Sequence, residues 1–126
     1  METVLRQAKL RADGPPLRLR VVIGDGLRAD WTAKLLVGEA VTHTLFGRSD
    51  GAGGVDALDA AAFVDEGVLE WIVVVFGPSA DSPYHVEVDL LQGGASAFER
   101  PVRLAGTAPA RKTTLLRGEI RPKRSA

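Results

Sequence analysis

The longest run of apolar residues in the chain spans residues 69–77 and is interrupted by a single charge, Glu70. Residues with β-branched and aromatic side chains dominate this run, which favours a strand over a helix. In an extended chain Trp71 and Val73 face one way while Ile72 and Val74 face the other, so both faces of the segment are mostly apolar. We therefore predict that residues 69–77 form the central strand of the fold.

Several other segments alternate between apolar and polar positions, as strands with one buried and one solvated face do. The clearest is residues 84–90, in which four apolar positions alternate with His85, Glu87 and Asp89. Residues 98–104 alternate as well, and Pro101 among them predicts an edge strand or a bulge, because proline cannot donate a hydrogen bond to a ladder. The remaining predicted strands cover residues 17–23, 31–37, 41–46 and 113–121.

Two stretches give less regular patterns. Residues 3–12 fit helical and alternating spacing equally well, so residues 1–16 hold an N-terminal strand or helix, and we favour a strand that turns back at the two prolines. Residues 47–54 contain four glycines and are predicted to form a loop. Residues 55–62 have the spacing of one short helix, with a short strand at residues 61–64 as the alternative.

Short strands separated by turn signals, without strong amphipathic helices between them, indicate antiparallel sheets rather than βαβ units. We predict an all-β fold, an antiparallel β-sandwich of about seven or eight strands with at most one short helix. In strand count it resembles immunoglobulin-like or C2-like sandwiches, a likeness that carries no function. The 126 residues fit a single domain, in which residues 122–126 form a basic tail.

Composition narrows the classes of partner. The 16 basic and 16 acidic residues balance, so no large field favours nucleic acid or acidic membranes. The absence of cysteine excludes disulfides, thiolate metal sites and a cysteine nucleophile. No apolar run reaches the roughly 18–20 residues of a membrane span, and residues 1–10 lack the apolar core of a secretory signal. We expect a cytoplasmic protein, and the content of alanine, glycine and arginine is typical of bacterial genes rich in GC.

One motif suggests catalysis. Residues 47–51 read Gly-Arg-Ser-Asp-Gly and match the G-x-S-x-G nucleophile elbow, in which Ser49 would be the nucleophile of a serine hydrolase. That elbow belongs to a large, mostly parallel sheet that a chain of this length is too short to build, and His85 is the only histidine downstream. We therefore expect no catalytic residues and no enzymatic activity.

Two kinds of ligand site are conceivable, and each has a structural alternative. Four aspartates could gather as calcium ligands at one end of a sandwich, although aspartate is also a common turn and cap residue. These are Asp25, Asp50, Asp56 and Asp59. The aromatic residues could form a carbohydrate platform if exposed, but aromatics at alternating strand positions are more typical of a core. We expect no metal site and no cofactor.

These observations predict a non-enzymatic β-sandwich that binds another protein, self-associates or helps to assemble a complex. The expected binding surface is an exposed strand edge or the loops at one end of the sandwich. We favour the glycine-rich loop, since loops on a rigid scaffold commonly carry binding residues. Its candidate residues are Arg48, Ser49, Asp50, Asp56 and Asp59. The alternatives, in order, are a loop-end module for calcium or carbohydrate and the serine hydrolase that would use Ser49.

Overall fold

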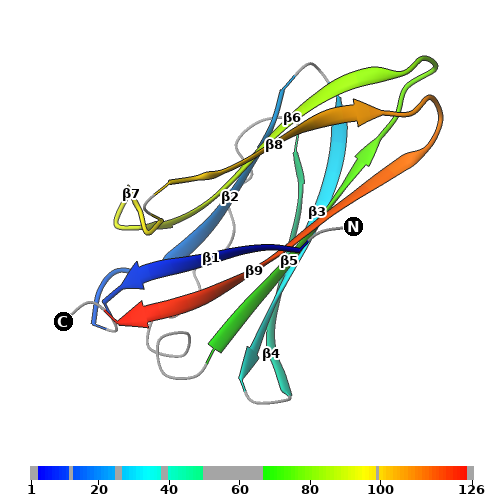
Figure 1. Cartoon of the computed structure of the whole chain (residues 1–126). Coiled ribbons are helices and arrows are strands. Elements are labelled where there is room, and N and C mark those ends of the chain that lie inside the picture. Colours follow the sequence, from blue (N-terminus) through cyan, green and yellow to red (C-terminus); the bar gives the residue numbers. More distant parts are fainter. Residues whose placement is uncertain are drawn as a thin grey trace.

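The computed structural model describes residues 3–11, 13–24, 27–37, 40–49, 67–98 and 100–124. This part of the chain contains nine strands in two sheets and no helix (Figure 1). The predicted all-β class is confirmed, and two sheets around one core are consistent with a β-sandwich. The short helix or strand predicted within residues 55–64 lies outside the described residues.

The larger sheet, sheet A, has five strands. Their order is β1 (Thr3–Leu10), β9 (Thr113–Arg124), β5 (Gly67–Phe76), β3 (Arg28–Val37) and β4 (Ala40–Ser49). All neighbours are antiparallel except β1 and β9, which run parallel, so the prediction of a purely antiparallel sandwich is wrong at this pair. Parallel neighbours need a long connection, and nearly the whole chain lies between β1 and β9.

The smaller sheet, sheet B, is built around β6 (Ser82–Gln92). On one side β6 pairs with β2 (Leu17–Ile23), and it also pairs with β7 (Ala95–Ser96) and β8 (Val102–Ala108). Gly93 and Gly94 connect β6 to β7 with φ angles of 63° and 80°. Positive φ at both positions is what a two-residue hairpin turn of type I′ requires, so glycine is used here for its backbone freedom.

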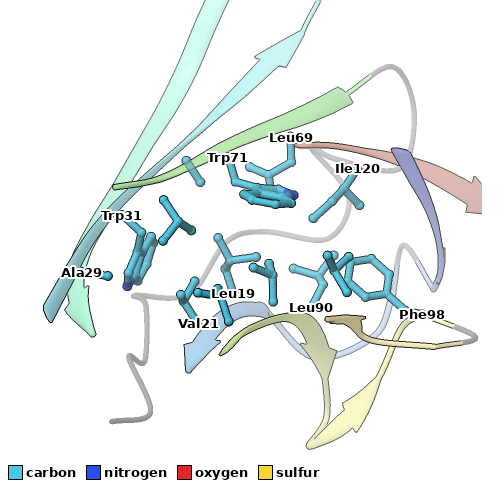
Figure 2. Close-up of a cluster of buried hydrophobic side chains, with 14 of the residues drawn as sticks. Leu19, Val21, Ala29, Trp31, Leu69, Trp71, Leu90, Phe98 and Ile120 are labelled. Atoms are coloured by element: carbon cyan, nitrogen blue, oxygen red, sulfur yellow. The ribbon is translucent and has the colours of Figure 1, made fainter. Parts of the chain in front are cut away.

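The core lies between the sheets and takes alternate residues from each strand (Figure 2). Trp71 and Ile120 enter it from sheet A, while Leu19 and Leu90 enter it from sheet B, and all four are buried. The alternation predicted for residues 17–23 is therefore confirmed, and that predicted for residues 84–90 holds except at Asp89. Each large apolar side chain buried in this way contributes roughly 1.5–3 kcal/mol.

The predicted central strand is β5, which lies in the middle of sheet A between β9 and β3. Its inward face is fully buried, with Trp71 among the largest residues there. Trp71 lies against Gly118 of β9, where an added Cβ would be 2.3 Å from the indole ring. Glycine at this position lets the ring pack directly on the neighbouring backbone. The outward face of β5 is also apolar but is only partly covered.

The first and the last elements of the described chain are both strands. Residues Thr3–Leu10 form β1, which confirms the strand favoured over the helix. The predicted end of the last strand at residue 121 is wrong, because β9 continues through Arg124 and Pro122 pairs with Ala8 of β1. The described pairing of β9 with β5 ends at Ile120. Beyond that residue β9 has a described neighbour on one side. Such an edge position tolerates proline, because proline has no N–H to donate to a second neighbour.

Two predicted strand boundaries next to glycine residues differ from those in the structure. The expected loop at residue 47 begins later, since β4 runs to Ser49 and Gly47 pairs with Trp31. The strand predicted at residues 98–104 is β8, which begins after Pro101 and pairs with β6 alone among the described strands, so the predicted edge position is confirmed. β8 continues through Gly106, where an added Cβ would be 2.5 Å from the Tyr84 hydroxyl. Glycine there accommodates a packed ring and does not end the strand.

Candidate functional site

Exposed apolar side chains gather on one sheet. Among the described residues, the large hydrophobic side chains with the greatest exposure all belong to sheet A. They are Leu5 at 63%, Val41 at 51%, Leu115 at 39% and Ile72 at 38% exposure. They come from four different strands, so the exposure is a property of the face and not of one irregular segment.

Strand register brings part of this set together. Val74 of β5 pairs with Leu115 of β9, and Ile72 and Phe76 are the next outward positions of β5 on either side of Val74. Directly paired side chains in a sheet have Cβ atoms about 4.5–5.5 Å apart, and diagonal neighbours are about 7–8 Å apart. These four residues therefore form one contiguous surface at the centre of sheet A, which we name the β5–β9 patch.

Charged side chains of both signs border the β5–β9 patch. The Arg28 guanidinium lies 5.0 Å from the centre of the Phe76 ring, and its Nη2 is 3.9 Å from Oδ2 of Asp30. On the other side Arg121 Nη2 is 3.6 Å from Oε2 of Glu119. An exposed cation over a ring contributes about 0.5–1 kcal/mol. Arg28 therefore covers one end of the patch without removing its apolar character.

Leu5 and Val41 lie away from the β5–β9 patch, on the two outermost strands in the order of sheet A. Leu5 pairs with Glu119, so β9 separates it from β5. The outward face of sheet A thus has an apolar centre and isolated apolar residues at its margins.

The outward face of sheet B differs in character. Arg103 Nε is 3.8 Å from Oε1 of Glu87, and Arg18, which pairs with Leu91 farther along β6, is exposed as well. A shallow hollow of about 310 Å³ lies on this face, with Val22 and His85 among its lining residues. Apolar surface is present here, but charged side chains interrupt it.

The polar strand face predicted at residues 85, 87 and 89 is only partly solvated. His85 is exposed and Glu87 is partly exposed, whereas Asp89 is buried, so the expectation of solvation is wrong for Asp89. The Ser96 hydroxyl donates to Oδ1 of Asp89 at 2.6 Å, and Phe98 N donates to the Ser96 hydroxyl oxygen at 3.2 Å. The short strand β7 covers Asp89, which gives this carboxylate a role in holding the β7 segment.

The predicted binding residues fall in two groups. Arg48 and Ser49 belong to β4, where they pair with Asp30 and Ala29, and are not in a loop. Asp50, Asp56 and Asp59 lie outside the described residues. Arg48 shares one cross-strand row with Asp30, Val74 and Leu115, which places its backbone in line with the β5–β9 patch.

The other candidate sites have less structural support in the described residues. Ser49 is the last residue of β4 and pairs with Ala29 in a mostly antiparallel sheet, whereas a nucleophile elbow belongs to a large, mostly parallel sheet. The described residues contain no group of three histidines or carboxylates able to hold a metal ion, and Asp25 is outside them as well. Most of the aromatics considered for a carbohydrate platform are buried, as the core interpretation predicted. These are Trp31, Trp71, Tyr84 and Phe98.

Sequence reasoning placed the binding surface in the glycine-rich loop and missed the β5–β9 patch. Two features of the sequence pointed to this patch. The strand at residues 69–77 is apolar on both faces, and Leu115 lies on the face of its strand that points away from the core. Alternation alone does not reveal which of two apolar faces another layer covers.

Comparison with protein-family models, with curated proteins and with solved structures gave no match. In the described part of the chain, no helix has the length and apolar character needed to cross a membrane. We therefore infer function from the faces and edges of the two sheets.

Proposed function

We propose that this protein is a non-enzymatic β-sandwich that binds another protein, as a component of a larger assembly, and that it docks this partner on the outward face of sheet A. The β5–β9 patch is the observation that carries the proposal. Contiguous exposed apolar surface bordered by polar residues is characteristic of protein interaction sites. We propose an immunoglobulin-like or C2-like sandwich as the scaffold only, because its two sheets present such faces.

The position of the patch suits recognition by a protein. Its side chains project from β5 and β9, and β5 is paired on both sides, so the backbone needs little ordering on binding. An apolar centre with a charged rim is the usual anatomy of a protein interface. The rim here includes Arg28, Asp30 and Glu119, so the partner should present both signs of charge around an apolar centre.

The proposal is tested by removing the apolar centre while leaving the core intact. We would capture proteins from the source cells on the immobilised wild-type chain and on an Ile72→Asp/Leu115→Asp double variant. Charges placed in the centre of an interface should weaken binding of a captured and purified partner at least about a hundredfold in calorimetry. Both residues face outward, so circular dichroism should show an unchanged fold.

Val22→Asp is the matched control, because it places the same charge on a partly buried aliphatic position of sheet B. This variant should retain the partner with the affinity of the wild type. Equal retention by the double variant contradicts the proposal. Loss of the partner on Val22→Asp alone would instead locate binding at the hollow of sheet B.

A further inference from the structure

Three arginines line an open groove of about 450 Å³ where an edge of sheet A meets an edge of sheet B. Arg6 comes from β1, Arg100 and Pro101 precede β8, and Arg103 belongs to β8. Lys9 N donates to the Ala97 oxygen at 2.8 Å, which ties β1 to the segment between β7 and β8. β1 and β8 are visible as the edges of their sheets in Figure 1. We refer to this surface as the arginine groove.

Arg6 has an unusual position for a permanent charge. It lies in the inward-facing row of β1 with Ala8 and Leu10, which are buried, and it pairs with buried Ile120. A guanidinium keeps its charge at all physiological pH values, and burying it without a partner is costly. Arg6 is half-buried and lines the groove, with its Nη1 donating to the Leu5 carbonyl at 3.0 Å.

The arginine groove carries more positive than negative charge. Arg103 has Glu87 as a partner at 3.8 Å, but both side chains are substantially exposed, so this pair is weak. Within the described residues, Arg6 and Arg100 have no carboxylate at ion-pair distance. Three positively charged guanidinium groups line one groove, and a bound anion would offset their mutual repulsion.

We propose that the arginine groove binds the phosphate or sulfate group of a small molecule. The planar guanidinium fork matches the oxygens of such groups and can donate two parallel hydrogen bonds to each. This site is separate from the β5–β9 patch, and it stands whether or not a protein docks on sheet A.

The test is calorimetric titration of the full chain with inorganic phosphate, phenyl phosphate, inorganic sulfate and phenyl sulfate. Chloride at matched ionic strength serves as the blank. Saturable binding of one equivalent is expected, with backbone amide shifts at Arg6 and Arg103 in nitrogen-15 spectra. Binding of the phosphate pair or of the sulfate pair identifies the preferred group, and either supports the proposal.

Arg6→Gln and Arg100→Gln should each weaken binding about tenfold or more, since each removes a charge-assisted donor set. Arg6→Lys should also weaken binding, because lysine keeps the charge and lacks the planar fork of donors.

Arg18→Gln is the control. It removes an exposed arginine from the outward face of sheet B and should leave binding unchanged. Arg100 is exposed outside a strand, so its variant tests the groove even if Arg6→Gln unfolds. Absence of saturable binding, or an equal loss in Arg18→Gln, overturns the proposal.

Discussion

The outward faces of sheets A and B cover the same core from opposite sides and differ in what they present. Sheet A exposes the β5–β9 patch, while sheet B exposes arginines and the Glu87–Arg103 pair and keeps the Asp89 carboxylate buried beneath β7. Both faces alternate with a buried inward face, so both are compatible with the same stable scaffold. The fold therefore does not need apolar residues on the outward face of sheet A to be stable. For this reason we infer that these residues serve binding.

The inward side of sheet A should be far more sensitive to truncation than its outward side. Trp71→Ala removes one of the largest buried side chains in the core and should lower the free energy of unfolding by roughly 3–5 kcal/mol. Urea unfolding followed by fluorescence and circular dichroism measures this loss. A decrease below about 1 kcal/mol would show that the inward face of β5 had been misidentified.

The contact between β5 and β9 can be tested from the other strand. Gly118→Ala places a methyl group against the Trp71 ring and should cost about 1–3 kcal/mol of stability through overpacking. Gly24→Ala is the matched control, since an added Cβ there makes ordinary contact at 3.7 Å with His85. If both variants have the same melting temperature, the ring does not pack directly on the backbone of β9.

On sheet B, stability should depend on a polar contact beneath the surface. Ser96→Ala leaves buried Asp89 without its hydroxyl donor and should cost about 1–2 kcal/mol. Ser82→Ala removes an exposed hydroxyl that donates to the Ala80 carbonyl at 3.0 Å, and it should change stability by less than about 0.5 kcal/mol. Equal effects in chemical unfolding would remove the structural role assigned to Asp89.

The smallest effect is expected at the surface of the patch itself. Ile72→Thr should change the free energy of unfolding by no more than about 0.5 kcal/mol, because Ile72 faces outward and threonine is favourable in strands. The same change at adjacent Val73 buries a hydroxyl in the core and should cost about 1–3 kcal/mol. Similar losses at the two positions would mean that an unrecognised layer covers Ile72.

Periodicity predicted the strands and their buried faces because side chains alternate with a period of two in any sheet. It indicated Tyr84 and Leu90 as core and placed β5 at the centre of its sheet. Strand direction was less accessible, since β1 and β9 pair in parallel through contacts between the two ends of the chain.

Glycine caused the main errors of boundary. Gly47 suggested a loop, yet it lies in a strand, and so does Gly106, where glycine is required by the close approach of Tyr84. Local sequence does not distinguish a glycine that turns the chain from one that makes room for a ring. The candidate site was missed for a related reason, because exposure of the second face of β5 depends on which layers cover it.

Cross-saturation NMR tests directly whether the partner binds the outward face of sheet A. It uses the methyl-labelled chain with the partner captured by the wild type. Irradiation of the unlabelled partner should transfer saturation to the methyl groups of Ile72, Val74 and Leu115 and should leave Val22 on sheet B unaffected. Saturation at Val22 with none at Ile72 and Leu115 would contradict the account and move the binding face to sheet B.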